Sequence, residues 1–482
     1  MTDSPCVLLS VPSGASAGSV LRTGLVDRLL AAHPSAHIVL LSPLVRDPAF
    51  VREFTRSRVT LEELPPHAPK GLEGRLVALM QASYLGSWAT ESVRIRFDEA
   101  RRNKTIRWIR TKRFLTRLFA PSMARKATRY DLIDRLISHP AAEQLFDKYN
   151  PALVVVSSPG LIFAEIPLLR TAVRRGVRSV AIDASWDNFT NKLIPTRRVD
   201  RLIVWNQVMK DQAVSIHGYR PDDVLVSGPP QWDRYFAATG AMSRDVFFRQ
   251  IGADSARKLI TLTTTPRPLY PHHDHVLRVL VRAMQSNAWA YPSQILVRLH
   301  PRDDIEAYAE FKNVEHVIIE KPFRSTVKAG DGLDIDITAE NQQHLADTLR
   351  HSDVVINVAS TIAIEAAVFD TPVVNVSFDG EAPSEWVRSA KRYYRFTHYV
   401  NITRHDAVRV AETPEQMVEQ VGRYLLDPSL DGAGRRRVVD EQCAFTDGRS
   451  AERVGQFVAD ELAAVSGIPS HAPCVESLVS SR

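Results

Sequence analysis

A motif with an imidazole and two guanidinium groups, Arg298-Leu299-His300-Pro301-Arg302, is the first candidate for chemistry. It closes the apolar run 295–299, which is typical of a buried parallel strand. Proline cannot continue the strand pairing, so it would present His300 at the carboxyl end of that strand. An imidazole there can donate to a phosphate oxygen, and Arg298 or Arg302 can add a charged donor. The alternative is a capping histidine beside two surface arginines.

A second motif joins hydroxyl groups to a carboxylate. The sequence 352–367 is expected to form a strand, a short loop and a helix that opens at Ser360-Thr361. Free N–H groups at a helix N-terminus favour an anion, and the two hydroxyls add hydrogen bonds. Glu365 falls one turn after Thr361, where its carboxylate can accept the hydroxyls of a ribose. An ordinary N-cap with an internal ion pair is the alternative.

A hydroxyl-rich strand end, Thr263-Thr264-Thr265-Pro266-Arg267, follows the first strand of the same half of the chain. Thr264 and Thr265 are candidates for contact with a pyrophosphate. An ordinary turn explains the same residues.

The first half carries its own candidates. Ser13 and Gly14 lie in the small-residue stretch 11–18, which allows close ligand approach but matches neither a dinucleotide fingerprint nor a P-loop. After the expected strand 179–182 comes Asp183-Ala184-Ser185-Trp186-Asp187-Asn188, with side chains suited to sugar rings and hydroxyls. Asp187, with Asp183 second, is the predicted general base, and Trp186 and Asn188 are predicted acceptor contacts. An Asp/Asn turn anchored by one tryptophan is the alternative.

No metal set is expected. The run His272-His273-Asp274-His275 has suitable residue types but no second cluster of ligands. Cys6, Cys443 and Cys474 have no metal or redox spacing. We therefore expect neither a metal nor another cofactor beside the nucleotide-linked substrate.

The elements that must position these groups form two series of alternating strands and helices. Strands are expected at 7–11, 38–41, 153–156, 179–182, 202–204 and 224–226, and again at 259–263, 295–299, 317–319, 354–356 and 373–376. This alternation predicts an α/β fold of two Rossmann-like, doubly wound parallel sheets facing a cleft. The predicted parts are an acceptor domain at 1–240 with a basic helical insertion at about 90–150, a donor domain at 241–447, a helix at 448–466 that returns to the first domain, and a tail at 467–482.

Bulk properties agree with two globular domains. The 482 residues are 44% hydrophobic, and the net charge is +6. Residues 94–129 contain thirteen Lys or Arg and include Trp108 and Phe114, so an anionic membrane surface is a possible partner and a solvated helical insertion is the alternative. With no signal peptide and no long apolar stretch, we expect a cytoplasmic protein, or one peripheral on the inner face of the cytoplasmic membrane.

In combination, the motifs resemble those of bacterial GT-B glycosyltransferases of surface and capsular polysaccharide, a group that borders the CDP-glycerol glycerophosphotransferases. The resemblance covers about residues 150–465 and rests on Ser185–Lys192, Val204-Trp205-Asn206, Gly228-Pro229-Pro230-Gln231-Trp232-Asp233, Arg298–Arg302 and Ala359–Ala367. The His-Pro and Ser-Thr motifs are also similar to those of sialyl- and β-Kdo-transferases. The resemblance implies that His300, Ser360 and Thr361 contact the donor phosphate and that Glu365 holds the nucleotide ribose. Glycerophosphotransferases usually carry Asp-Tyr-Ser-Ser where this chain has Asn357-Val358-Ala359-Ser360.

The resulting hypothesis is a metal-independent glycosyltransferase of surface polysaccharide assembly. It would move a sugar from a nucleotide-sugar donor to a glycan or lipid-linked acceptor, with His300 and Arg298 stabilising the departing phosphate. Two other activities of the same fold stay open, a UDP-sugar 2-epimerase and a CDP-glycerol-type glycerophosphotransferase. A non-enzymatic basic scaffold that binds an anionic polymer is a further alternative, although no nucleic-acid motif is present and no nucleic-acid partner is expected.

Overall fold

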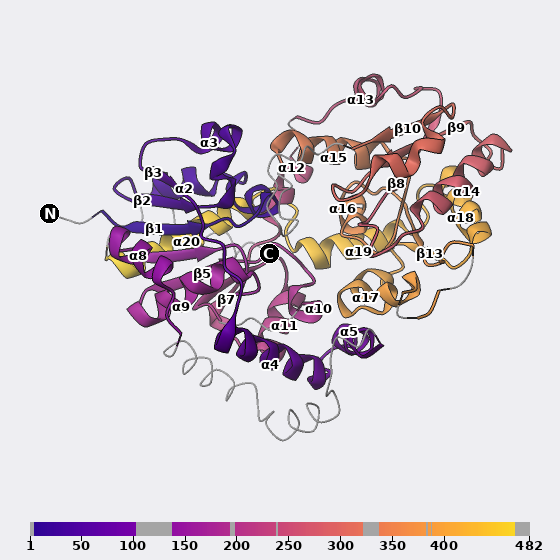
Figure 1. Cartoon of the computed structure of the whole chain (residues 1–482). Helices are drawn as coiled ribbons and strands as arrows, with labels where there is room; N and C mark the ends of the chain where they lie inside the picture. Colours follow the sequence, from indigo (N-terminus) through magenta and orange to yellow (C-terminus); the bar gives the residue numbers. More distant parts are fainter. Residues whose placement is uncertain are drawn as a thin grey trace. The chain divides into compact units, whose positions relative to one another are not determined.

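The computed structural model describes residues 4–102, 137–192, 198–237, 240–321, 337–381, 384–386 and 388–467. The chain divides into two compact units, with boundaries at Asp233/Arg234 and at Gln442/Cys443. The segments before the first boundary and after the second form the N-terminal unit, to which Ile337 also belongs, and the rest of the segment between them forms the C-terminal unit (Figure 1). The boundaries predicted from sequence, 240/241 and 447/448, lie slightly further along the chain.

The N-terminal unit contains a parallel sheet of seven strands in the order β3-β2-β1-β4-β5-β6-β7. The sequence winds outward in one direction from β1 and in the other from β4, so a topological switch point lies between these two neighbours. The strands are β1 (Cys6–Ser10), β2 (His37–Leu41), β3 (Val59–Glu62), β4 (Leu153–Val156), β5 (Arg178–Ile182), β6 (Arg201–Val204) and β7 (Val224–Val226).

Helices surround this sheet, because the βαβ connection between parallel strands places a helix on one face or the other. They include α1 (Gly14–Ser16), α2 (Leu25–Ala32), α3 (Pro48–Phe54), α4 (Gly71–Ser87), α5 (Glu91–Arg102), α8 (Pro140–Tyr149), α9 (Ile166–Arg175), α10 (Asn188–Asn191), α11 (Gln207–His217) and α20 (Ser450–Ser466).

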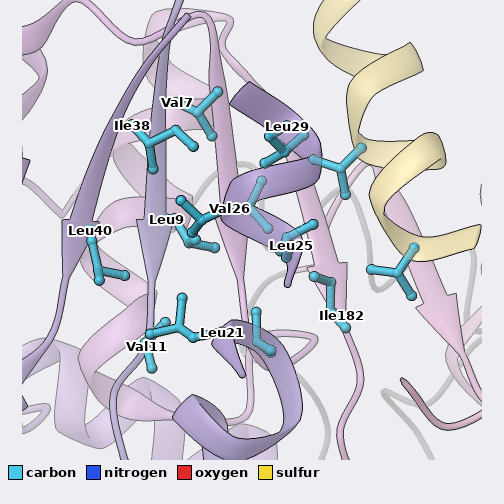
Figure 2. Packing of buried hydrophobic residues seen from close by; sticks show 14 of the residues in the cluster. Val7, Leu9, Val11, Leu21, Leu25, Val26, Leu29, Ile38, Leu40 and Ile182 are labelled. Atoms are coloured by element: carbon cyan, nitrogen blue, oxygen red, sulfur yellow. The ribbon is translucent and has the colours of Figure 1, made fainter. Parts of the chain in front are cut away.

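The C-terminal helix α20 is part of the N-terminal unit. Val454, Val458 and Leu462 on α20 belong to the same buried cluster as the strand residues Val7 and Leu9. Figure 2 shows this cluster between the strands and α2, with α20 in yellow beside it. The C-terminal helix therefore packs on the first domain, as the sequence predicted.

The C-terminal unit contains a parallel sheet of six strands in the order β10-β9-β8-β11-β12-β13, a Rossmann arrangement with its switch point between β8 and β11. The strands are β8 (Lys258–Thr263), β9 (Ser293–Arg298), β10 (Val317–Glu320), β11 (Val354–Asn357), β12 (Val373–Val376) and β13 (Arg409–Ala411). The helices include α12 (Asp233–Phe236), which begins at the boundary, α13 (Arg244–Ile251), α14 (His273–Gln285), α15 (Ala339–His351), α16 (Ile362–Val368), α17 (Thr397–Thr403), α18 (Pro414–Leu426) and α19 (Gly432–Cys443).

Two doubly wound parallel sheets confirm the predicted fold class. Their central strands are mostly apolar, as expected where helices cover both faces of a sheet; all four residues of β4 and of β11, for example, are buried. Within the described ranges, no helix is long and apolar enough to cross a membrane.

Candidate functional site

The three motifs of the C-terminal unit meet at one edge of its sheet. Strands β9 and β11 flank β8, with Thr263 paired to Arg298 and Leu262 paired to Ile356. All three strands run in the same direction, so the segments that follow them leave the sheet at its carboxyl edge. That edge beside the switch point is where open α/β sheets bind ligands.

His300 is held by hydrogen bonds on both sides. Its backbone N–H donates to Thr264 Oγ1 at 2.8 Å, which ties the segment after β9 to the segment after β8. Its Nδ1 accepts the backbone N–H of Arg302 at 3.1 Å, so the ring proton resides on Nε2. Burial, followed by the nearby charge of Arg302, lowers the pKa of His300 to about 4. At neutral pH the residue is thus a neutral imidazole with an Nε2–H donor, which suits the predicted phosphate contact.

Thr265 is fixed by a histidine that the sequence did not identify as part of the site. Its backbone N–H donates to His273 Nε2 at 2.9 Å, and its hydroxyl lies 3.0 Å from the same nitrogen. Burial lowers the pKa of His273 to about 3, so the ring stays neutral and accepts. The His272–His275 run therefore supplies a support for the Thr264-Thr265 loop, and only the position of His273 at the start of α14 could have suggested it.

A buried aspartate supports the other side of the His300 loop. Asp303 accepts the Tyr308 hydroxyl at 2.7 Å, and its Oδ1 lies 3.5 Å from Nε of Arg267. Its backbone carbonyl accepts Lys321 Nζ at 2.7 Å. These contacts gather cationic side chains near His300, since Lys321 and Arg302 both act on its pKa.

The loop before α16 differs from the expectation of free N–H groups. The hydroxyls of Tyr394 and Tyr399 accept hydrogen bonds from the backbone of Ala359 and Ser360 respectively. The backbone N–H of Ile362 donates to Ser360 Oγ at 3.3 Å. Two N–H groups that were expected to be free are therefore used by tyrosines of the following elements, while the predicted contacts of Ser360 and Thr361 with a donor phosphate stay predictions. Ala359, at φ 33°, is in the sparsely populated left-handed region that recurs at functional sites.

Glu365 and Arg298 lie deeper than predicted. Glu365 is 6% exposed and accepts the Tyr235 hydroxyl at 2.6 Å and the Thr361 hydroxyl. Burial raises the pKa of Glu365. Arg298 is 4% exposed and donates to Glu320 at 2.8 Å. The alternative of a surface arginine is wrong for Arg298, because this residue is buried at the end of β9, while its contact with a donor phosphate and the ribose contact of Glu365 stay predictions.

In the N-terminal unit, Asp183 and Asp187 share one loop after β5 but differ in setting. Asp183 is 1% exposed, and its Oδ1 accepts the N–H of Ser185 at 3.2 Å and the amide of Asn188. Burial raises the pKa of Asp183 to about 7. Among the described residues, its Oδ2 has no hydrogen-bond partner. Asp187 is more accessible, with 17% of its side chain exposed, and pairs with Lys192 at 3.2 Å.

Two predicted acceptor contacts, Trp186 and Asn188, are buried to 5% exposure each. Both side chains are thus mostly covered in this structure, and their contact with an acceptor stays a prediction. Asn188 instead holds the Asp183 carboxylate.

Ser13 and Gly14 are buried in the structure, so the expected open approach for a ligand is absent there. Ser13 caps α1 through Ser16 N–H at 3.1 Å, and the Ser16 hydroxyl accepts that of Ser157 at 3.0 Å. The network ends at Glu165, a residue that the sequence did not suggest.

Glu165 lies just beyond β4, beside the switch point of the N-terminal sheet. Its carboxylate accepts the Ser157 N–H at 2.8 Å and the Ser158 hydroxyl at 2.7 Å. The side chain is fully buried, and burial raises its pKa to about 7. A buried carboxylate surrounded by serines ties the carboxyl ends of β1 and β4 together.

One further cluster has metal-ligand chemistry. The ligand atoms of His67, Glu73 and His139 lie within 4.8 Å of one another. However, the Arg170 guanidinium contacts the Glu73 carboxylate and lies 3.4 Å from His139 Nε2. A buried guanidinium already supplies the positive charge there, so we interpret the cluster as a structural network that joins α4, α8 and α9.

Solved structures with the same fold cover nearly the whole chain. A UDP-bound structure of S. aureus MnaA has a TM-score of 0.54 at 11% identity and covers 97% of this chain and 100% of that one. The UDP-GlcNAc 2-epimerase from Neisseria meningitidis bound to UDP-GlcNAc gives 0.53 at 10% identity, covering 94% and 100%. The wall teichoic acid polymerase TagF gives 0.50 at 10% identity, covering 96% and 89%. At this identity, these likenesses show the GT-B fold alone.

A search of curated protein sequences finds no match to this chain. A family profile does match, over residues 166–460, which is more than half of the chain. This match includes the loop after β5 and the whole carboxyl edge of the C-terminal sheet. The chain therefore belongs to the CDP-Glycerol:Poly(glycerophosphate) glycerophosphotransferase family.

Proposed function

We propose that this transferase moves an activated group from a nucleotide-linked donor to a hydroxyl of a glycan or lipid-linked acceptor during assembly of a cell-envelope polymer. The donor is held by the C-terminal unit and the acceptor by the N-terminal unit. The observation that carries the proposal is the neutral His300, fixed at the switch-point edge with an Nε2–H donor.

The donor phosphate is the group that this edge suits best. An N–H donor on a neutral ring hydrogen-bonds a phosphate oxygen without the desolvation cost of a buried cation. Lys321 and Arg302 lie near His300 and add positive charge as the phosphate departs. Thr264 and Thr265 define the adjacent loop, which His273 holds in place. We propose that these residues, and not a metal ion, offset the developing charge.

On the acceptor side we assign general base catalysis to Asp187. It is the more accessible of the two aspartates, and a general base must reach the proton that it removes. Asp183, being fully buried, instead fixes the loop by holding Ser185 and Asn188. Asp183 is accordingly a positioning residue in this proposal.

The donor class has two candidates. A nucleotide sugar agrees with the motifs of glycosyltransferases, and transfer would then build a glycan of the capsular type. CDP-glycerol is favoured by the family match. Against it, Asn357-Val358-Ala359-Ser360 stands where glycerophosphotransferases usually carry Asp-Tyr-Ser-Ser.

A thermal-shift panel of CDP-glycerol, UDP-N-acetylglucosamine, CMP-sialic acid and GDP-mannose separates these candidates. A ligand that binds only the native state raises Tm, because at a concentration a hundred times its Kd it stabilises the folded protein by about 2.7 kcal/mol. We expect one nucleotide class to stabilise the protein and the His300→Ala variant to lose that stabilisation. If no compound shifts Tm, the proposal is wrong. Conversion of UDP-N-acetylglucosamine without any acceptor would identify an epimerase instead.

Two finer proposals accompany this function. Transfer should persist in EDTA if protein residues alone neutralise the phosphate. Loss of transfer in EDTA that Mg²⁺ restores would contradict metal independence.

The basic segment 94–129 would hold the enzyme at an anionic membrane surface. Most of that segment lies outside the described residues. Sedimentation with vesicles that contain phosphatidylglycerol tests it, with neutral vesicles as the control.

A further inference from the structure

The short helix α10, which follows the Asp187 loop, is anchored by side chains of α4, α5 and the link between them. Three hydrogen bonds reach three successive residues: Tyr84 Oη donates to Phe189 O at 3.1 Å, Thr90 Oγ1 to Thr190 O at 2.7 Å, and Arg96 Nε to Asn191 Oδ1 at 2.9 Å. A helix of four residues has little stability of its own. Its conformation therefore depends on these outside contacts.

The contact of Arg96 has a chemical consequence for Asp187. Asn191 Nδ2 donates to Asp187 Oδ2 at 3.3 Å, while its Oδ1 accepts from Arg96. A carboxamide can present either its oxygen or its NH₂ to a neighbour, whereas a guanidinium can only donate. Arg96 therefore fixes the amide so that its NH₂, and not its oxygen, faces the Asp187 carboxylate.

The frame that carries Arg96 is itself anchored. On α5, Val93, Ile95 and Phe97 are buried to 1%, 4% and 6% exposure. Thr90 also accepts the Val93 N–H at 3.1 Å and so begins α5 while it holds α10. At the other end of the pair, Glu73 in the first turn of α4 contacts the buried Arg170.

We propose that the α4–α5 pair is a positioning frame for the acceptor base, in which Arg96 orients the Asn191 amide and thereby the Asp187 carboxylate. This rests on the proposed role of Asp187. Without Arg96, the amide can turn its oxygen toward the carboxylate, which disfavours the ionised form and raises the pKa of the base. The frame thus acts on the ionisation of the Asp187 carboxylate together with Lys192 and the Ser185 hydroxyl, which also contact it.

The test compares Arg96→Leu, which removes the donor, with Arg96→Lys, which keeps a donor-only group. Arg220→Leu in the same unit is the matched control, because the Arg220 side chain is 77% exposed and its distance to Asp223, 4.0 Å, makes a weak ion pair at most. Initial rates of nucleotide release are measured with CDP-glycerol or UDP-N-acetylglucosamine, whichever is turned over, and with poly(glycerol phosphate) or a lipid-linked glycan as acceptor. Each variant is assayed from pH 5 to pH 8.5.

We expect Arg96→Leu to lower kcat about tenfold, to leave the donor KM unchanged and to move the acid limb of the pH profile to higher pH. Arg96→Lys should recover most of kcat and the original acid limb, and Arg220→Leu should match the wild type. An unmoved acid limb in Arg96→Leu, or the same change in Arg220→Leu, would overturn the frame. If Arg96→Leu does not fold, Arg96→Gln takes its place, since it keeps a polar side chain of similar length.

An Asp187→Asn background separates this inference from the proposed function. If Asp187→Asn retains turnover, the assignment of the base is wrong. If Asp187→Asn is inactive while Arg96→Leu behaves as the wild type, the base is right and the frame is wrong. If Arg96→Leu lowers the residual rate of Asp187→Asn by the same factor as in the wild type, Arg96 does not act through Asp187.

Discussion

In the proposed function, replacement of His300 by alanine removes one hydrogen-bond donor to the donor phosphate; it also removes the acceptor of the Arg302 N–H in the loop. A hydrogen bond to a charged group contributes about 1.5–3 kcal/mol. At 1.4 kcal/mol per factor of ten, kcat/KM should fall by roughly 10- to 150-fold. Because the pKa of His300 lies near 4, the ring is neutral throughout the assay range. The ratio of wild-type to variant rates should therefore be the same at pH 5.5 and pH 7.5.

Initial rates of nucleotide release under kcat/KM conditions, at both pH values, check this expectation. His316→Asn serves as the control, since His316 is in the same unit with φ 64°, a backbone conformation that asparagine tolerates. The Tm of each variant shows whether the fold is retained. A variant that folds and turns over at the wild-type rate would remove His300 from the mechanism. A rate ratio that grows strongly from pH 7.5 to pH 5.5 would show that an imidazolium acts there, contrary to the structure.

Three further predictions concern stability. The pKa of Glu165 is about 7 in the folded state against 4.5 in the unfolded state, so its contribution to the free energy of unfolding, at most about 3 kcal/mol, is fully present below pH 4.5 and is lost as pH rises through 7. Glu165→Gln should flatten the pH dependence of the free energy of unfolding in urea, whereas parallel curves for wild type and variant would show that burial does not raise this pKa. Gly228→Ala should lower the free energy of unfolding by about 2 kcal/mol or more, because φ is 80° and the added Cβ would lie 2.4 Å from Ser450 Oγ. Gly24→Ala, at φ 83° with no atom within 4 Å of the added Cβ, measures the cost of the backbone conformation alone, and equal losses of stability in the two variants would contradict the steric argument. Asp233→Ala should cost about 1–2 kcal/mol by removing the acceptor of the first two N–H groups of α20, and an unchanged urea midpoint would show that water replaces it.

Most of the strands that the sequence predicted lie in the interior of the two sheets and are largely buried, although the edge strands β7 and β10 were predicted as well. The central strand β4 is an uninterrupted apolar run, and the predicted bounds of β4 and β12 coincide with those in the structure. The two strands that were missed, β3 and β13, lie at the edges of their sheets. An edge strand is short and only half covered, so its sequence, Val-Thr-Leu-Glu for β3, does not stand out from a loop.

The site motifs were placed correctly for a related reason. A polar residue directly after a buried strand must lie at the carboxyl edge of a parallel sheet, which is how His300, Thr264 and Asp183 were found. The partners of Arg298 and Glu365 could not be predicted, because they come from distant positions. Glu320 follows Arg298 by a whole βαβ connection, and Tyr235 precedes Glu365 by 130 residues.

The same rule explains why some predicted ligand contacts are structural. A polar side chain at the edge of a sheet must hydrogen-bond, and the sequence does not say whether the partner is a substrate or the chain itself. Trp186, Asn188 and Ser13 lie in the interior, and two of them, Asn188 and Ser13, hydrogen-bond neighbours in their own loops. His300 differs, since its Nδ1 accepts the N–H of Arg302 and, among the described residues, no hydrogen bond is found for its Nε2. Because the segment after β9 also lies at the carboxyl edge of the sheet, where open α/β sheets bind ligands, the Nε2–H is the donor that the proposed function assigns to the donor phosphate.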